Sequence, residues 1–455
     1  LSRATKCVIG WPVCCRSFYT CQNLPMVNVL AEWLALLEAR HPTEIDLGLD
    51  RVAAVWSTIV QRREQQGGSL SLPTAVTVAG TNGKGSCLAS MQAILLAHGY
   101  RVGLFTSPHF LRYNERISVQ GMPADDKTIV RAFDEIELAR GNTSLTYFEF
   151  GTLAALLVFV DAGLDIMLLE VGLGGRLDAI NIIDADVSVV TSIALDHQAW
   201  LGDTRELIAA EKLGIARSSR PLVVAEADHP VGFEQMIAAT GARRFLIENE
   251  FRLQTEGDQF DLDVQSLGGS LLQFLELPAT GLLPSNKAAA IQALVCAGFE
   301  LDPKTVAQAL DGLELSGRQQ RLSIAGRQVI VDVAHNPAAA QVLAAALTPI
   351  SGRYLAVASV LDDKDWRGIV EPLSGTFSKW HIAEISDSNR ATKAQTLLEV
   401  LYNAELSSTV FESVEMAFQS AIEEARAGDV VVVFGSFHTV SAVLNMQRKS
   451  DGSVE

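Results

Sequence analysis

Cysteine is scarce in this 455-residue sequence, and long apolar runs are absent. Beyond the first 25 residues the cysteines are Cys87 and Cys296 alone, which excludes a disulfide framework and fits a reducing cytoplasm. The longest clean apolar stretches, such as residues 153–160, run for about eight residues, whereas a membrane span needs roughly 20. We therefore expect a cytoplasmic protein with no transmembrane helix and no membrane partner.

Positive charge is also in short supply. Lys and Arg number 36 against 53 Asp and Glu, which gives a net charge of -17. A chain this acidic repels nucleic acid unless it carries a local basic patch, so we expect no nucleic-acid partner. The densest basic cluster, around Arg62 and Arg63, is interpreted as a solvated face.

The first 25 residues differ in composition from the rest. They contain Arg3, Lys6 and Arg16 but no acidic residue, as a transit-like leader does. The alternative is that Met26 is the true start and that residues 1–25 are upstream sequence. A helical pattern of apolar residues begins directly after Met26, and it favours this alternative.

Length and composition indicate two α/β domains. Hydrophobic residues make up 48% and charged residues 20% of the chain, as in well-packed globular proteins, and the length exceeds one ordinary core. Short apolar runs alternate with helical patterns, which predicts a mostly parallel sheet buried on both faces. The expected strands are 74–79, 101–105, 165–170, 187–191, 328–333, 354–359 and 430–434, and the expected helices include 27–40, 85–98 and 147–162.

The pattern weakens between residues 243 and 278, where alternation at 260–264 predicts a small antiparallel addition. It restarts after Gly317, so we place the domain junction near Ser316. Residues 26–315 are expected to form an ATP-binding domain and residues 316–448 a smaller Rossmann-like α/β domain, followed by a tail at 449–455.

A glycine-rich turn follows the first predicted strand and opens a predicted helix. Its residues are Gly80, Thr81, Asn82, Gly83, Lys84, Gly85 and Ser86. Glycines let backbone N–H groups wrap around phosphate, and the helix N-terminus adds favourable partial charge. Lys84 is placed to neutralise the outer phosphates, and the Ser86 hydroxyl to reach a magnesium ion. The common Walker pattern wants glycine at Val78 and Ser or Thr at Gly85, so an ordinary glycine-rich turn is the alternative.

Further segments make the sequence recognisable. They are Ile45-Asp46-Leu47-Gly48-Leu49, Ser107-Pro108-His109, Tyr113-Asn114-Glu115-Arg116, Thr146-Tyr147-Phe148-Glu149, Glu170 to Asp178, Leu195-Asp196-His197, Glu211-Lys212, Gly317-Arg318, Asp332 to Pro337 and Gly435-Ser436-Phe437-His438-Thr439. Together with the glycine-rich turn, they resemble the folylpolyglutamate synthase/dihydrofolate synthase family of the Mur ligase superfamily, most of all its bacterial members that carry out both reactions. Cys87 and Ile180 stand where that family often has Thr.

The resemblance implies a P-loop domain of the Mur ligase type and an ATP-dependent ligase. Such an enzyme adds L-glutamate to 7,8-dihydropteroate and then extends reduced folates with further glutamates. The acid is activated as an acyl phosphate, and negative charge accumulates at each step, so cations should dominate catalysis. Magnesium, in two positions, is implied with ATP, a monovalent cation is a further candidate, and we expect a monomer.

The metal ligands are carried over from the resemblance. Glu170 ends a predicted parallel strand, at the edge where ligands bind in such sheets; a solvent-facing charge is the alternative. The resemblance makes Glu170 a magnesium ligand, places Ser86 and Ser107 near the metal, and gives His197 to a second ion. Magnesium prefers oxygen, so a histidine ligand is unusual, and Asp196 beside it is expected to fix its orientation.

The catalytic residues implied are Lys84, Lys212 and His335. By composition Lys212 is a surface lysine beside Glu211, but in the family the matching lysine is carbamylated. The second domain would help to hold ATP through Arg318 and Asp332, with His335 facing the cleft. Asn286 would contact the nucleotide from the first domain. A turn asparagine, a solvated arginine and a helix cap before Pro337 are the structural alternatives.

The pteridine side is assigned to three segments and one arginine. Tyr147 and Phe148 offer flat apolar surfaces, although ordinary core packing is the alternative for them, and Arg116 suits a carboxylate. The complete set is Ile45, Asp46, Leu47, Arg116, Thr146, Tyr147, Phe148, Glu149 and Leu177.

Three other functions stay open. Folylpolyglutamate synthase activity alone fits the same residues. A peptidoglycan Mur ligase usually has a separate domain before the phosphate loop, and the interval of about 55 residues between Met26 and Gly80 is short for one. A nucleotide-binding switch without ligase activity would not need the segment from Asp332 to Pro337 or an arginine in the linker.

Overall fold

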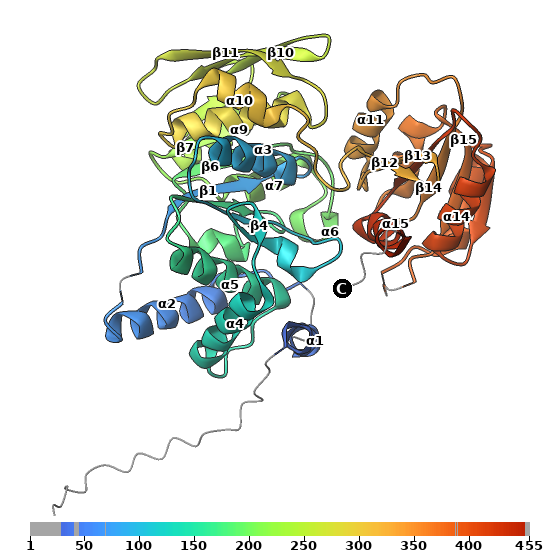
Figure 1. Cartoon of the computed structure of the whole chain (residues 1–455). Coiled ribbons are helices and arrows are strands. Elements are labelled where there is room, and N and C mark those ends of the chain that lie inside the picture. The colour runs from blue at the N-terminus through green and yellow to red at the C-terminus, as the bar shows by residue number, and fades with distance from the viewer. Residues whose placement is uncertain (1–28, 41–44, 69, 387, 389, 451–455) are drawn as a thin grey trace, which may run out of the picture.

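The computed structural model describes residues 29–40, 45–68, 70–386, 388 and 390–450. These residues form two α/β domains, each built around its own sheet (Figure 1). The expected leader at 1–25 lies outside the described residues, as does most of the expected tail. Within the described part of the chain, no helix is both long and apolar enough to cross a membrane.

The larger domain is built on an eight-stranded sheet. Its strands are β1 (Thr74–Ala79), β2 (Val102–Phe105), β3 (Ile117–Val119), β4 (Met122–Pro123), β5 (Ile166–Glu170), β6 (Val187–Val190), β7 (Pro221–Val224) and β8 (Arg243–Leu246). Their order is β4-β3-β2-β5-β1-β6-β7-β8. The neighbours β2, β5, β1, β6, β7 and β8 pair in parallel. At one edge, β3 and β4 add two antiparallel strands. The predicted mostly parallel sheet is therefore confirmed.

Helices cover both faces of this sheet, which is why its central strands are buried almost throughout and mostly apolar. One face carries α3 (Lys84–Ala97), α9 (Pro284–Cys296) and α10 (Pro303–Leu310). The opposite face carries α1 (Leu30–Arg40), α2 (Asp50–Gln65), α4 (Asp126–Arg140) and α5 (Tyr147–Ala162), and farther along the sheet α7 (Arg205–Leu213) and α8 (Phe233–Thr240). Short helical turns lie at η1 (Tyr113–Arg116), η2 (Ala179–Ile182) and α6 (Gln198–Leu201).

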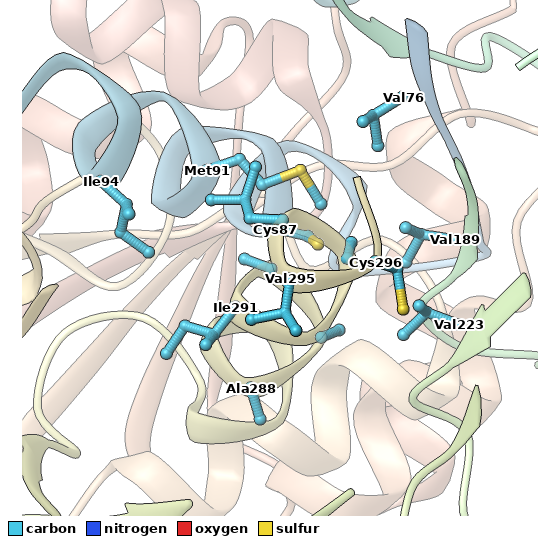
Figure 2. Close-up of a cluster of buried hydrophobic side chains, with 14 of the residues drawn as sticks. Val76, Cys87, Met91, Ile94, Val189, Val223, Ala288, Ile291, Val295 and Cys296 are labelled. Carbon is cyan, nitrogen blue, oxygen red and sulfur yellow. The ribbon is translucent and has the colours of Figure 1, made fainter. Parts of the chain in front are cut away.

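The two cysteines of the body lie in the core between α3 and α9 (Figure 2). Both are free and buried. Burial raises the pKa of the Cys296 thiol to about 12 and moves the pKa of Cys87 in the same direction. These thiols act as small apolar residues rather than as nucleophiles.

The basic cluster at Arg62 and Arg63 is only in part the solvated face expected from the sequence, because Arg62 is exposed but Arg63 is half-buried. Arg63 is bidentate to Glu135 of α4, at 2.8 and 2.7 Å, and also pairs with Asp161. Arg62 donates to the Leu138 carbonyl. Long-range partners, which local sequence does not reveal, turn these residues into ties between α2, α4 and α5.

The predicted antiparallel addition is present between β8 and α9. It consists of β9 (Arg252–Glu256), β10 (Gln259–Gln265) and β11 (Leu271–Pro278), in the order β11-β10-β9. Arg243–Leu246, at the start of the stretch where the pattern weakens, is not part of this addition, because it pairs in parallel with β7 as an edge strand of the large sheet.

The smaller domain holds a six-stranded sheet in the order β12-β13-β17-β14-β15-β16. Only β12 runs antiparallel to its neighbour. The strands are β12 (Gln320–Ile324), β13 (Arg327–Val331), β14 (Tyr354–Ala358), β15 (Phe377–Ala383), β16 (Ser408–Phe411) and β17 (Val430–Phe434). One face packs on α11 (Pro337–Ala346), α12 (Trp366–Val370), η3 (Glu371–Leu373) and α13 (Ala394–Asn403), and the other on α14 (Val414–Glu424) and α15 (Phe437–Ser450).

Candidate active site

The glycine-rich turn joins β1 to α3, as predicted, and close packing explains its glycines. A side chain at Gly80 would collide with the Thr191 hydroxyl. Gly83 has φ +86°, and a Cβ there would lie 2.5 Å from Asn286 Oδ1, so only glycine fits without strain. Asn286, in the first turn of α9, therefore packs directly on the turn.

The segment directly after β6 forms hydrogen bonds that fix the glycine-rich turn. Thr81 N–H donates to Ser192 O at 2.9 Å, and Asn82 N–H donates to Ser192 Oγ at 2.8 Å. The Thr81 hydroxyl donates to Ala194 O at 3.0 Å. Lys84 curls back over the turn, with its ammonium group 3.0 Å from Gly80 O. The loop is thus preorganised, and Gly85 and Ser86 follow it in the first turn of α3.

Glu170 lies beside this first turn at the end of β5. It is buried, and its Oε2 accepts the Ser107 N–H at 3.1 Å. Burial raises the pKa of Glu170, against the opposing effect of Lys84. A solvent-facing charge is therefore excluded. Ser107 contacts Glu170 through its backbone, and an added Cβ on Gly85 would lie 4.0 Å from the same carboxylate oxygen.

Lys212 is not a surface lysine, because α7 turns it inward and leaves it 2% exposed. Burial, reinforced by the charge of Lys84, lowers the pKa of Lys212 to about 7. Glu211, its neighbour in sequence, instead pairs with Arg176 at 2.7 Å.

Asp196 and His197 follow β6 and face the smaller domain. His197 has φ +51°, and burial lowers the pKa of its ring to about 4, so the ring is neutral at pH 7. The ring contacts Lys364 Nζ at 3.4 Å and Asp363 at 3.8 Å. Asp196 does not orient this ring as expected, since its hydrogen bond with His197 comes from the backbone N–H and not from the ring.

The carboxylate of Asp196 binds side chains of the smaller domain. Lys364 Nζ lies 2.6 Å from Oδ1, and both His335 Nε2 and Asn336 Nδ2 lie 3.1 Å from Oδ2. Burial alone would raise the pKa of Asp196, but His335 and Lys364 outweigh it and hold the pKa far below its usual range. The amides of Asn336 and Asn82 also pair reciprocally, at 3.1 and 2.9 Å.

The other second-domain candidates lie on the same side. Arg318 sits over the Phe437 ring, 5.2 Å from its centroid, and burial lowers the pKa of its guanidinium. Asp332 follows β13 and accepts N–H groups of Gln319 and Ala334, both at 2.8 Å. Burial raises the pKa of Asp332, and Arg318 opposes that effect. The cap on α11 is Asn336, not His335, since Asn336 Oδ1 accepts Ala339 N–H.

A cavity of about 710 Å³ opens where the two domains meet. Its apolar lining comes from Ile45, Leu195 and Trp200 of the larger domain. Its charged and polar lining includes Asp196, His197, His335, Asn336, Asp362, Asp363, Lys364, Asp365 and Arg390. An amphipathic space with charges of both signs suits a zwitterion.

The residues predicted for the pteridine are partly gathered by Arg51. It pairs with Asp46 at 2.7 Å and with Glu149 at 3.2 Å, and so connects residues 45–47 to the start of α5. Nearby, Gly48 N–H donates to Leu177 O at 3.3 Å. Thr146 and Glu149 are buried and cap α5 reciprocally, so local structure already engages them.

Aromatic surfaces remain beside this network. Phe148 packs in the space left by the missing side chain of Gly172. Tyr147 is half-buried, and the centroid of its ring lies 5.5 Å from Arg116 Cζ. Arg116 also donates to His109 Nδ1 at 2.8 Å.

Sequence reasoning missed Lys364, the role of Asn336 and the cross-domain role of Asp196. A usable signal was the acid-rich turn from Asp362 to Asp365, a few residues after the apolar strand β14. Among the described residues, no group of three or more His, Cys, Asp or Glu side chains is arranged to hold a metal ion. Glu170 and His197 contact different neighbours, and their assignment to two separate ions rests on the resemblance.

Comparison with known proteins gives matches along nearly the whole chain. Residues 317–437 match the family model described as Mur ligase, glutamate ligase domain. The dihydrofolate synthase/folylpolyglutamate synthase of Escherichia coli (strain K12) is 43% identical over 434 residues, which cover 93% of this chain and 97% of the relative.

Solved structures agree with these matches. Escherichia coli FolC in complex with DHPP and ADP superposes with a TM-score of 0.86 at 40% identity, covering 93% of this chain and 99% of the other. A bifunctional folylpolyglutamate synthase/dihydrofolate synthase with Mn, AMPPNP and L-glutamate bound gives a TM-score of 0.83 at 40% identity, covering 93% and 98%.

Proposed function

This chain belongs to the dihydrofolate synthase/folylpolyglutamate synthase family, and from that premise we propose how its two domains carry out the reaction. The chain is an ATP-dependent ligase of the Mur ligase type that joins L-glutamate to a pteroate or folate carboxylate. We propose 7,8-dihydropteroate as the acceptor in one reaction and reduced folates in the other. The observation that carries the proposal is the contact of the phosphate loop with Asn336, next to His335, across the domain boundary.

The phosphate loop binds ATP in this proposal. Residues Gly80 to Ser86 surround the phosphates, Lys84 turns from Gly80 O toward them, and Asn286 supports the loop. Arg318 and Asp332 complete the nucleotide site from the second domain. The substrate carboxylate attacks the γ-phosphorus, ADP leaves, and an acyl phosphate forms. The glutamate amine then attacks the carbonyl carbon, and phosphate departs with loss of a proton from nitrogen.

Glu170 and Ser86 supply the kind of oxygen donors that Mg²⁺ and Mn²⁺ prefer. Glu170 is a buried carboxylate beside the first turn of α3, and a cation there would offset the cost of its burial. We therefore propose that these two residues hold a divalent ion, near Ser107. Such an ion, when bound, neutralises phosphate charge and polarises the γ-phosphoryl group. His197 is kept for a second ion, because its ring is neutral at pH 7.

Lys212 meets the physical requirement for carbamylation. Its lowered pKa, about 7, leaves a substantial neutral fraction of the amine at physiological pH, and only the neutral amine reacts with CO₂. The product is a carbamate with release of one proton, and the resulting anion would lie near the charge of Lys84. Measurement of the protein mass under non-acidic conditions tests for the carbamate. An unmodified Lys212 in the active enzyme would contradict the proposed carbamylation.

We place the incoming glutamate in the cavity between the domains. Lys364 and Arg390 suit its carboxylates, and the acidic residues at 362, 363 and 365 suit its ammonium group. His335 lies at the rim of the same space, which supports its catalytic assignment. The pteridine would lie along Tyr147, Phe148 and the segment 45–47, and Arg116 would receive an acidic group of the substrate.

Further points complete the proposal. The domain division is 26–315 and 316–448, the enzyme acts as a monomer in the cytoplasm, and a monovalent cation accompanies the nucleotide without an assigned ligand. Domain closure would exclude water and protect the acyl phosphate.

One assay tests the function. Purified protein is incubated with ATP, magnesium, dihydropteroate and L-glutamate, and the products are identified by mass. A parallel reaction with tetrahydrofolate separates dual activity from folylpolyglutamate synthase activity alone. ATP hydrolysis that is equally fast without pteroate and glutamate would point to a nucleotide switch instead.

A further inference from the structure

The domain boundary next to the phosphate loop is held by a small, partly buried network. Its members are Asn82 and Asp196 from the larger domain and His335, Asn336 and Lys364 from the smaller one. Asp196 alone receives hydrogen bonds from three side chains of the other domain. Asn336 is the member that contacts both larger-domain residues.

The single amide of Asn336 makes four hydrogen bonds. Its Oδ1 accepts Ala339 N–H at 2.9 Å, which caps α11, and accepts Asn82 Nδ2 at 3.1 Å. Its Nδ2 donates to Asn82 Oδ1 at 2.9 Å and to Asp196 Oδ2 at 3.1 Å. The side chain is 2% exposed. A cap needs only an acceptor, so the donor group serves the domain boundary alone.

We propose that Asn336 is a positioning residue that seats the smaller domain on the phosphate loop, a role that rests on the ligase function proposed above. The backbone of Asn82 is fixed by Ser192 and Thr191, so its amide presents a rigid partner. Asn336 locks α11 to that partner and thereby sets His335, its neighbour in sequence, against Asp196. The amide pair thus aligns the residues of the smaller domain that line the cavity, such as His335 and Lys364, with the nucleotide.

Two substitutions remove this contact without removing the helix cap. Asn336→Asp keeps an acceptor for Ala339 N–H but places a second carboxylate against Asp196 and faces Asn82 Oδ1 without a donor. Asn336→Ser also caps a helix but is too short to reach both partners. The matched control is Ser413→Ala, which removes the cap of α14, where Ser413 Oγ accepts Met416 N–H at 3.2 Å, and does not touch the domain boundary.

The measurements are the rate of amide formation, the ratio of ADP to amide product, and the melting temperature. In Asn336→Asp the rate should fall on the order of tenfold to a hundredfold, as expected for a lost buried hydrogen bond with an introduced repulsion. The ratio should rise above that of the wild type, because a badly seated domain admits water. Water then cleaves the acyl phosphate and returns the free carboxylate and inorganic phosphate. Asn336→Ser should show the same pattern more weakly.

Several outcomes would overturn the role of Asn336. A wild-type rate and ratio in Asn336→Asp would exclude it, and so would an equal rise of the ratio in Ser413→Ala at a similar loss of melting temperature. A double-mutant cycle with Asn82→Ser adds a third check, since fully additive losses would contradict a shared contact. If the wild type forms no amide at all, the proposed function itself fails, which is a separate result.

Discussion

The domain boundary beside the phosphate loop has two unlike walls, one from each domain. The phosphate-loop wall, residues 80–86 with Glu170 and Lys212, is shaped mainly by backbone, and glycines at 80 and 83 allow its close packing. The C-terminal wall, Asp332, His335, Asn336 and Lys364, is shaped by side chains, most of which end on Asp196 or on the loop.

This difference determines which kind of substitution each wall tolerates least. A backbone cradle fails when a side chain is added, because the peptide groups themselves bind phosphate. A wall of paired side chains fails when a partner is removed, because a buried polar group is then left alone. The following predictions test this contrast, from the largest expected effect to the smallest.

Lys84→Ala removes the cation of the phosphate-loop wall. Removal of one electrostatic contact to the transition state commonly costs about 10²–10³ in kcat, and we expect a loss at the upper end of that range or beyond, with circular dichroism unchanged. Near-normal turnover would show that the nucleotide binds elsewhere. It would also contradict the proposed difference between the two walls.

Lys364→Met tests the C-terminal wall by subtraction. It removes the ammonium group 2.6 Å from Asp196, so we expect amide formation to fall roughly tenfold or more and the free energy of unfolding to fall by about 1–3 kcal/mol. The control is Lys379→Met, since Lys379 makes an equally short but more exposed pair with Glu424, worth about 0–1 kcal/mol. Equal effects in the two variants would contradict a special role for the buried pair.

Gly83→Ala tests the phosphate-loop wall by addition. Gly83 has φ +86° and meets Asn286, whereas Gly99 has φ +80° and open space around its missing Cβ. Both alanine variants carry the backbone strain of about 1–2 kcal/mol, but only the first pushes on the nucleotide site. The KM for ATP should therefore rise about tenfold in Gly83→Ala and stay unchanged in Gly99→Ala. A rise in both would assign the effect to strain alone.

Lys212→Met tests how the free energy of unfolding depends on pH. We expect the change per pH unit to be the smallest of these effects. The folded pKa, about 7, lies below the unfolded value, so the unfolded chain binds more protons between about pH 7 and pH 10.5. Wild-type stability in CO₂-free buffer should therefore rise with pH in that window, by at most about 1.4 kcal/mol per unit. Denaturant titrations should show this contribution lost in Lys212→Met; an identical slope would mean that Lys212 is charged in the folded state.

Local pattern was enough for the phosphate loop itself. The strand, turn and helix around Lys84 follow from residues adjacent in sequence, and β1 and α5 have the predicted bounds. The structure bears out the two-domain α/β class in the same way. By contrast, β15 and β16 were missed, because segments such as Phe377–Ala383 mix polar and apolar residues at the sheet periphery.

The C-terminal wall and Lys212 were harder to foresee because they depend on contacts distant in sequence. Lys212 was interpreted as exposed since its neighbour Glu211 is charged, yet helix geometry sends the two side chains in different directions. Asp196 was expected to serve His197, but its partners come from another domain. Arg63 was misjudged for the same reason, since Glu135 and Asp161 lie on other helices.

The cavity at the domain junction has a consequence for inhibitor design. A small molecule seated there would touch Leu195 and Trp200 on one side and Lys364 and Arg390 on the other. Its affinity would then depend on the angle between the two lobes as well as on complementary chemistry. Screening against the nucleotide-loaded and nucleotide-free enzyme in parallel would therefore select different compounds, and those that favour one arrangement would arrest the catalytic cycle at that stage.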